Sequence, residues 1–288
     1  MAGPIFRRFD DPTQFYALVA PALAAREVEN NVLLGAARRV AERQKEAVLL
    51  AAVLNDGAPA VAALREPPHA LVISTADADD VARLAAGLQE AGEPIPSVVS
   101  VGTVARRFAE CWADRTGQDQ RPLDVMILYT LAALIPPARP ASGTLRAATA
   151  DDAAWLTDWF LAFADEVGLP AAERGLAHNG PLVRKKIAEG RQFVWEDRGR
   201  PVAMVGFAPG GLDGARVAPV MTAPAERRKG YATAGVAALC RTLIDSRIGW
   251  CGVFADAAYP PSNRVYQRLG FVEACRYESI EFTPRGAP

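Results

Sequence analysis

The residues whose types and spacing are best suited to chemistry lie in one run, Val217 to Ala232, in which a strand pattern gives way to a short basic loop and then to a helix. The first N–H groups of a helix have no hydrogen-bond partner within the helix, and the helix dipole makes this end favourable for an anion. Gly230 and Ala232 have little or no side chain to block a close approach. The run therefore predicts a pyrophosphate site at the helix entrance.

The same run resembles the phosphate-binding signature of the GNAT acyltransferase superfamily, which is Arg or Gln, two residues, Gly, one residue, and Gly or Ala. Arg227, Gly230 and Ala232 match this spacing. So short a match also occurs by chance at an ordinary basic helix start, but the preceding strand with Thr222 and Pro224 favours the GNAT interpretation. The resemblance implies acetyl-CoA as the acyl-donor cosubstrate. It places the pantetheine arm beside Val220, Met221 and Thr222, and the pyrophosphate beside Arg227, Arg228, Lys229, Gly230, Tyr231, Ala232 and Thr233.

A second run, Ala258 to Phe271, resembles the turn, short helix and Leu-Gly-Phe sequence that follow in the same superfamily. Tyr266 stands where the superfamily has a tyrosine near the acetyl-CoA sulfur, a phenol that can protonate the departing thiolate because its ordinary pKa is about 10. Tyr266 could instead be a structural aromatic beneath the cofactor, and Asn263 could contact the cofactor or merely cap the helix. Tyr259 and Pro261 stand where some relatives have Asn and Thr, which weakens the case for a cofactor contact at Tyr259.

The resemblance further implies direct attack of a neutral amine on the thioester, with backbone N–H groups of the strand polarising the carbonyl. A protonated amine cannot attack, so a general base must accept its proton. The sequence favours a solvated turn or capping role for each candidate carboxylate, and ordered water could serve as the base instead. The base therefore stays unassigned among Glu166, Glu173, Glu196 and Asp256, of which Glu196 and Asp256 lie near predicted strand ends.

The elements that position these runs follow a linker. Prolines and small residues from Pro136 to Gly143 remove helix-forming capacity and predict two domains, 1–136 and 144–288, joined by residues 137–143. The aromatic residues Trp155, Trp159 and Phe163 form one helical stripe that either fills the core or lines the acceptor site. The other elements expected in this half are strands at Thr144–Ala148, Gln192–Trp195, Pro201–Phe207, Arg216–Thr222, Gly252–Ala255 and Cys275–Phe282, and helices between Pro181 and Gly190, from Tyr231, and at Ser262–Arg268.

The first half has a similar order of elements, which predicts a duplicated structure. After the strand Ala70–Ser74, where a phosphate loop would lie, Asp77, Asp79 and Asp80 would repel a pyrophosphate and suit a helix N-terminus instead. We therefore expect an α/β (α+β) fold with two GNAT-like domains, each a mixed, largely antiparallel sheet flanked by helices, of which the first is degenerate and does not bind CoA. Its other expected elements are helices at Glu27–Glu46, Ala76–Ala91 and Thr103–Asp114, and strands at Val48–Leu54, Ala60–Leu64, Ser97–Val101 and Pro122–Leu134.

Composition narrows the function. The 32 basic and 33 acidic residues give a formal charge of −1, so no global field attracts nucleic acid or an anionic membrane. The four cysteines lack the paired spacing of metal ligands, and there are only two histidines, so we expect no metal site. Without a signal peptide or a long apolar run, we expect a cytoplasmic monomer or homodimer with no membrane partner. The expected activity is N-acetylation of a primary amine on an unidentified small molecule or peptide; the alternative is a CoA-binding regulatory or interaction module without turnover.

Overall fold

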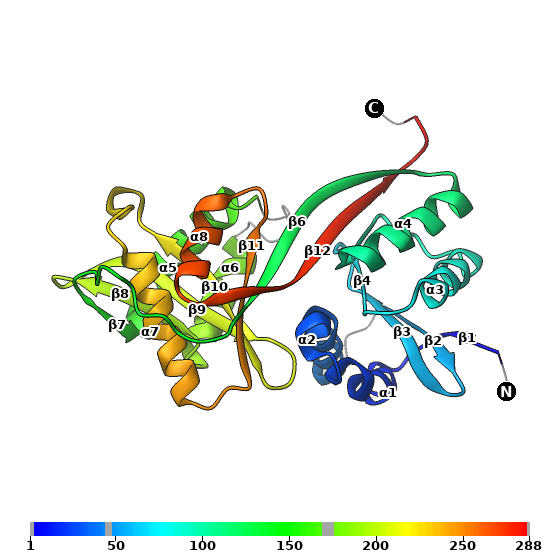
Figure 1. Cartoon of the computed structure of the whole chain (residues 1–288), viewed down its shortest axis with the longest axis horizontal. Coiled ribbons are helices and arrows are strands. Elements are labelled where there is room, and N and C mark those ends of the chain that lie inside the picture. The colour runs from blue at the N-terminus through cyan, green and yellow to red at the C-terminus, as the bar shows by residue number, and fades with distance from the viewer. Residues whose placement is uncertain (1–2, 44–47, 169–175, 287–288) are drawn as a thin grey trace.

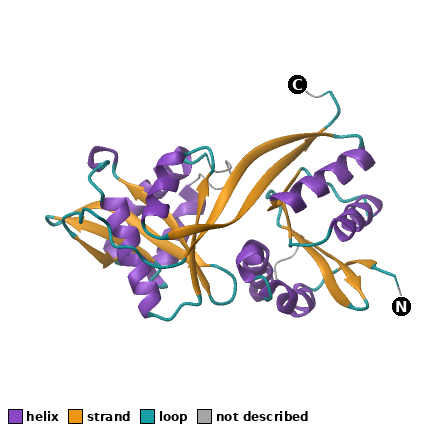
Figure 2. Cartoon of the chain, viewed as in Figure 1, coloured by secondary structure: helices purple, strands orange, loops and turns teal. Residues whose placement is uncertain are grey.

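The structure is a computed structural model that describes residues 3–43, 48–168 and 176–286. Figure 1 shows two lobes, and two long strands, β6 (Asp119–Leu131) and β12 (Phe271–Thr283), run between them. Helices cover both faces of the sheet in each lobe, as Figure 2 shows by secondary structure. The expected mixed α/β class is confirmed.

In the N-terminal half, local signals set several element ends. Asp11 accepts a hydrogen bond from the Thr13 N–H at 2.7 Å and caps the first helix. Asp56 and Gly57, with φ of 48° and 85°, form the tight turn of the first hairpin. The elements are β1 (Ile5–Arg8), α1 (Pro12–Ala24), α2 (Glu27–Arg43), β2 (Leu49–Asn55), β3 (Ala58–Arg65), β4 (Leu71–Ile73), α3 (Ala78–Glu90), β5 (Ser97–Val101) and α4 (Gly102–Thr116).

In the C-terminal half, one helix boundary differs from the prediction. The helix expected to start at Pro181 begins at Leu176 and continues through this proline, which lacks only its own N–H donor. The elements are β7 (Thr144–Ala147), η1 (Ala150–Asp152), α5 (Ala153–Glu166), α6 (Leu176–Ala188), β8 (Gln192–Asp197), β9 (Arg200–Pro209), β10 (Gly214–Thr222), η3 (Pro224–Glu226), α7 (Tyr231–Asp245), β11 (Trp250–Asp256) and α8 (Pro260–Arg268).

Within the described residues, one sheet of twelve strands unites the two halves, in the order β1-β2-β3-β4-β5-β12-β6-β11-β10-β9-β8-β7. β6, from the first half, pairs antiparallel with β11 and β12 of the second. β12 in turn pairs with β5 of the first half, from Tyr277 opposite Val101 to Glu281 opposite Ser97. The last strand of each half thus pairs with a strand of the other half. The predicted division at residues 137–143 falls between β6 and β7; it stays a prediction, and the sheet crosses it.

The helices form separate apolar layers against this sheet. In the second half, α7 and α8 cover one face, and their core includes Val236, Leu239 and Tyr266. α5 and α6 cover the other face, where Leu156 and Val183 are fully buried. The stripe of Trp155, Trp159 and Phe163 is partly buried and packs against this second core. None of the described helices is both long and apolar enough to span a bilayer.

Candidate active site

The main feature of the candidate site is a pair of parallel strands that part. β10 pairs with β11 at Gly214, Ala215 and Arg216, and no later residue of β10 has a partner on β11 among the residues described. Its other edge stays paired with β9 as far as Thr222. The backbone N–H and C=O groups of β10 that face the gap are therefore free of the sheet ladder, and buried groups of this kind need another partner.

A bulge re-aims β10 at this point. The register with β9 shifts between Val217 and Val220, and the residues between them include Pro219, which has no N–H to donate. Beyond the bulge, Val220 packs toward the core beneath α7, whereas Met221 is buried beneath α5. Thr222 is partly buried and uses its carbonyl to accept a hydrogen bond from Arg227 Nε at 3.2 Å. The expected pantetheine residues thus lie on the free edge of β10.

The loop before α7 gathers positive charge and left-handed backbone. Arg228 and Gly230 have φ of 65° and 88°. A Cβ placed on Gly230 would meet only the Ala141 side chain, at 3.8 Å, so backbone conformation rather than crowding calls for glycine. Arg227 pairs with Glu166 at 2.6 Å and Lys229 with Glu226 at 2.7 Å, all on the surface or half-buried. Such pairs contribute little stability, so these cations can turn to a phosphate at small cost.

The first turn of α7 contains the other residues expected around the pyrophosphate. Ala232 and Thr233 are partly buried there. Tyr231 is different, because its ring is buried and its hydroxyl donates to Asp197 Oδ2 at 2.9 Å. Hydrogen bonds from Ser142 and Tyr231 lower the pKa of Asp197. The Tyr231 side chain therefore anchors α7 to β8, and only its backbone remains for an anion.

Tyr266 lies on α8 in an aromatic surrounding. Its side chain is only 8% exposed, and its ring centroid is 5.8 Å from that of Phe271 and 6.5 Å from that of Tyr129. Burial, with a smaller effect of Cys240, raises the pKa of Tyr266 to about 12. The phenol therefore holds its proton at neutral pH. Tyr129 belongs to β6, so the first half supplies part of the wall around Tyr266, a contact that no local sequence signal predicts.

Asn263 fixes the turn between β11 and α8. Its Nδ2 donates to the carbonyls of Asp256 and Tyr259 at 2.8 and 2.9 Å. Its Oδ1 is buried and has no hydrogen-bond partner among the described residues. The side chain therefore does serve the turn, as one alternative held, while one polar atom is left that a ligand donor could satisfy.

The candidate bases that the structure describes already take part in ion pairs or hydrogen bonds. Glu196 forms an ion pair with Arg146 at 2.7 Å, and Glu166 is held by Arg227. Asp256 Oδ1 accepts the Ala258 N–H at 2.7 Å, as a turn-capping carboxylate does. Glu173 lies outside the described residues. The geometry assigns none of the three described carboxylates as general base. No group of three or more potential metal ligands occurs in the described part of the chain.

One buried residue near the candidate site, a lysine, is not predicted from the sequence. Lys186 of α6 is 4% exposed and donates from Nζ to the carbonyls of Phe207 at 2.6 Å and of Ala218, in the β10 bulge, at 3.1 Å. Burial first, and then the charges of Arg191 and Arg216, lower the pKa of Lys186 to about 7. A signal did exist: Lys186 follows the buried Val183 by three residues and so falls on the apolar face of α6.

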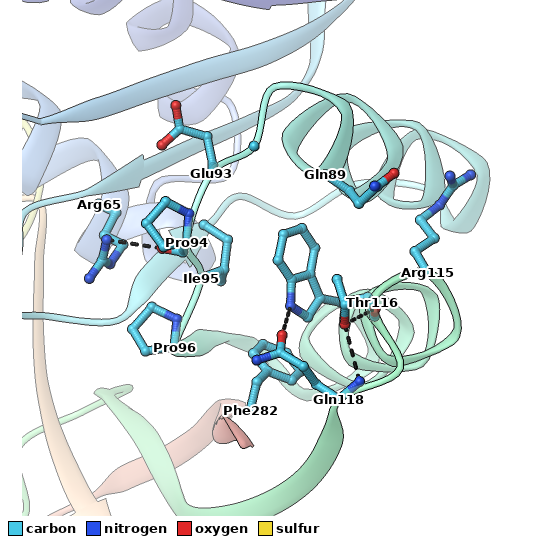
Figure 3. Close-up of a pocket in the computed structure, with 12 residues that line it drawn as sticks. Arg65, Gln89, Glu93, Pro94, Ile95, Pro96, Arg115, Thr116, Gln118 and Phe282 are labelled. Atoms are coloured by element: carbon cyan, nitrogen blue, oxygen red, sulfur yellow. Dashed lines mark hydrogen bonds between the residues drawn. The ribbon is translucent and has the colours of Figure 1, made fainter. Parts of the chain in front are cut away.

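A cavity of about 710 Å³ also lies in the first half, as Figure 3 shows. Trp112 forms one wall, and its Nε1 donates to Gln118 Oε1 at 2.9 Å. Arg65, at another side, donates to the Pro94 carbonyl. None of the residues expected to bind acetyl-CoA lines this cavity. It is therefore separate from the gap between β10 and β11.

Comparison with known proteins gives one family match and several similar solved structures. Residues 155–271 match the acetyltransferase (GNAT) family. A GCN5-related N-acetyltransferase from Sphaerobacter thermophilus is 15% identical, with 99% of this chain and 97% of that chain covered and a TM-score of 0.64. A protein from Drosophila is 16% identical, with 99% of this chain and 100% of that chain covered and a TM-score of 0.64. A tandem GNAT protein from the clavulanic acid biosynthesis pathway is 11% identical, with 97% of this chain and 98% of that chain covered and a TM-score of 0.55. No curated protein matches significantly.

Parallel strands that part at a bulge, in front of a glycine-led helix, give the C-terminal half the fold of a GNAT-type acyltransferase, and the whole-chain similarities extend this fold to both halves. Residues 155–271 form a domain of the acetyltransferase (GNAT) family. The expected family and the expected pair of GNAT-like domains are thus confirmed.

Proposed function

We propose that the C-terminal half transfers an acetyl group from acetyl-CoA to a primary amine of a small molecule or peptide. One observation carries the proposal: the free edge of β10 beyond Arg216 leads to the left-handed, cationic entrance of α7. A thioester cofactor with a diphosphate needs both features, because its amide-containing arm can pair with a strand edge and its phosphates suit helix N–H groups.

In this arrangement the donor lies along β10. The arm pairs with the backbone of Val220 to Thr222, and the pyrophosphate is bound by the N–H groups of Arg228 to Thr233. Arg227 and Lys229 exchange their surface carboxylate partners for phosphate oxygens. Asn263 contributes its unpaired Oδ1 as an acceptor for a cofactor donor.

The chemistry is direct attack of a neutral amine on the thioester carbonyl. A bond forms between the amine nitrogen and the carbonyl carbon, and the bond from that carbon to sulfur breaks. Backbone N–H groups at the free edge of β10 stabilise the charge on the carbonyl oxygen. Tyr266 donates its proton to the departing thiolate, which its raised pKa permits at neutral pH. The general base stays unassigned, and ordered water is the acceptor that we favour, since Glu196 and Asp256, the candidates near strand ends, have other partners.

A CoA-binding module without turnover is the second candidate. The burial of Tyr266 among Phe271 and Tyr129 favours it, because a phenol enclosed by rings can act as packing alone. The two candidates share the donor site and differ only in whether an amine is acetylated. The cytoplasmic location and the oligomeric state stay predictions.

Calorimetry with acetyl-CoA, followed by thiol-release assays over a panel of amines, tests the proposal. Acetyl-CoA should bind, and CoA thiol should be released only when a suitable amine is present. Tight binding without amine-dependent release would leave the non-catalytic module. Absence of acetyl-CoA binding would contradict both candidates.

A further inference from the structure

Basic side chains gather where β10 and β11 part. Arg216 is the last residue of β10 that pairs with β11. Its neighbours Ala215 and Val217 point into the core beneath α7, so the alternation of a strand directs Arg216 to the opposite face, toward α6. Lys186 lies on that face: the charge of Arg216 contributes to lowering the pKa of Lys186, and Lys186 Nζ donates a hydrogen bond to the Ala218 carbonyl of the bulge. The apex of the gap is therefore positively charged.

Arg216 lacks an anionic partner among the described residues. Its Nη2 reaches the Pro209 carbonyl at 3.5 Å, and its Nε is buried without a hydrogen bond. Burial first, and to a smaller extent the charge of Arg39, lower the pKa of Arg216. A guanidinium buried in this way is costly unless a ligand or a carboxylate satisfies it.

Helix α2 of the first half lies beside this cluster, but its carboxylates do not neutralise it. Glu27 Oε1 accepts hydrogen bonds from Leu212 N at 2.9 Å, Asp213 N at 3.0 Å and Trp250 Nε1 at 3.0 Å. Glu29 pairs with Arg26 at 3.1 Å. The Glu27 contacts attach the start of α2 to the second half, and both carboxylates already have partners. Figure 1 shows α2 next to β12.

We propose that the acetyl acceptor is an α-amino acid, and that Arg216 binds its carboxylate at the apex of the gap. The inference rests on the proposed function and adds the substrate class. A guanidinium binds a carboxylate through two parallel hydrogen bonds, which also fix its orientation. In an α-amino acid the amine and the carboxylate are attached to the same carbon atom. A carboxylate held at Arg216 therefore brings the amine to the place where the free edge of β10 presents the thioester.

Lys186 supports the same site without contacting the substrate. Its Nζ donates to the carbonyls of Phe207 and Ala218, and no carboxylate pairs with it among the described residues. It holds the bulge that shapes the gap, and because its pKa is about 7 it leaves Arg216 as the main positive charge there at pH 7.5. Arg191 is a third basic residue near this site. Its ion pair with Glu189 offsets its charge, so it contributes less positive potential than Arg216.

The test compares α-amino acids with their carboxamides as acceptors of the wild-type protein. A carboxamide has the less basic amine, so more of it is neutral at pH 7.5 and intrinsic reactivity favours it. We expect kcat/KM to be at least about 10-fold higher for the acids, against that intrinsic order. Arg216→Met should lower kcat/KM for the acids on the order of 100-fold and leave the value for the carboxamides nearly unchanged.

Two variants complete the design. Arg216→Lys keeps the charge but loses the two-pronged contact, and it should fall between wild type and Arg216→Met. Arg241→Met, which changes an exposed arginine of α7, is the matched control and should behave as wild type. Calorimetry should give one acetyl-CoA affinity for all four proteins.

Equal use of acids and carboxamides by wild type would overturn the inference, and would do so even if Arg216→Met did not fold. An equal loss for both acceptors in Arg216→Met would overturn it as well, since the arginine would then act on the thioester or on the fold. In both cases acetyl-CoA binding and amine-dependent thiol release would persist, so the proposed function would stand. A wild-type protein that binds no acetyl-CoA would refute that function too.

Discussion

In the C-terminal half, β10 and β11 part after Arg216, whereas in the N-terminal half the corresponding strands β4 and β5 remain joined past their last paired residues. Val72 pairs with Val99, and the next contact is made by a side chain: Ser100 Oγ donates to the Ile73 carbonyl at 2.7 Å. Ser100 is fully buried. A hydroxyl therefore satisfies a β4 backbone group beyond the last ladder pair, at the level where β10 has no further partner on β11 among the described residues.

The segment after β4 is also occupied by the protein itself. Asn30 of α2 accepts the Thr75 N–H on Oδ1 at 2.8 Å and donates from Nδ2 to Thr75 Oγ1 at 3.2 Å. Ser74 Oγ accepts the Ala62 N–H at 3.0 Å. The free donors and acceptors that a cofactor would need at this strand end are thus partly satisfied by side chains.

Charge separates the two helix entrances as well. The loop before α7 contains Arg227, Arg228 and Lys229, whereas the first turn of α3 contains Asp79 and Asp80. Carboxylates are stabilised at a helix N-terminus, but they repel a phosphate there. The same fold therefore presents an open, cationic strand end in one half and a closed, acidic one in the other. We propose that only the second half binds acetyl-CoA, as the sequence predicts.

The largest effect should come from Gly230→Glu. A side chain at a φ of 88° strains the entrance of α7, and its carboxylate lies where the pyrophosphate is proposed to bind, so affinity for acetyl-CoA should fall by more than about 100-fold. Calorimetry measures the loss. Gly57→Glu is the control, since Gly57 has a φ of 85°, equally open surroundings and a place in the other half. If both variants bound as wild type does, the entrance of α7 would not be the phosphate site.

The sequence predicts the site best where one continuous segment forms it. The strand, basic loop and helix from Val217 to Ala232 are formed as expected, because turn chemistry and helix entrance are local properties. Tyr266 likewise falls on the expected short helix. The burial of Tyr231 was not predicted, since the residue that captures its hydroxyl, Asp197, lies 34 positions away in the chain.

Contacts between distant strands could not be predicted from periodicity. The pattern at Pro122–Leu134 indicated a strand that closes the first half, and it indicated neither its start at Asp119 nor its place between β11 and β12. Alternation identifies the buried face of a strand, but not its neighbours. β1, with its four largely exposed residues, shows no alternation that would have identified it.

Lys186→Met tests the charged anchor of the β10 bulge, whereas in the first half a neutral side chain, Asn30, holds the segment after β4. The ordinary pKa of lysine is about 10.4, and that of folded Lys186 is about 7. Between these values the unfolded chain holds a proton that the folded chain lacks, so raising the pH favours folding at this residue. The stability of wild type relative to Lys186→Met should therefore rise from pH 7 to pH 10, by up to about 1.4 kcal/mol per unit.

Urea unfolding of both proteins at pH 7, 8 and 9 gives this difference. The control is Lys185→Met, which removes the adjacent, exposed lysine and its surface pair with Glu189 at 3.7 Å. Stability of that variant should follow wild type in its pH dependence. Parallel pH dependence of wild type and Lys186→Met would show that the ammonium group of Lys186 is not buried as the structure has it.

Tyr266→Phe tests whether the open half is also the catalytic half. Loss of the phenolic proton should lower turnover on the order of 100-fold, while acetyl-CoA affinity stays near that of wild type because the ring remains in its aromatic surrounding. Steady-state thiol release and calorimetry separate the two quantities. Tyr16→Phe, in the first half, serves as the control. Unchanged turnover in Tyr266→Phe would remove the phenol from the mechanism and leave it a packing residue.

The smallest effect is expected from Ser100→Ala, in the closed half. The variant leaves the buried Ile73 carbonyl without its hydroxyl donor, which should lower the free energy of unfolding by about 1 to 2 kcal/mol. Urea unfolding measures the loss, with Ser97→Ala as a control at the partly buried start of the same strand. Acetyl-CoA should bind wild type and Ser100→Ala with the same affinity and with one molecule per chain, because the acidic start of α3 still disfavours a phosphate. Two molecules per wild-type chain would contradict the contrast between the halves, and a second site gained only in Ser100→Ala would show that the hydroxyl alone keeps this strand end closed.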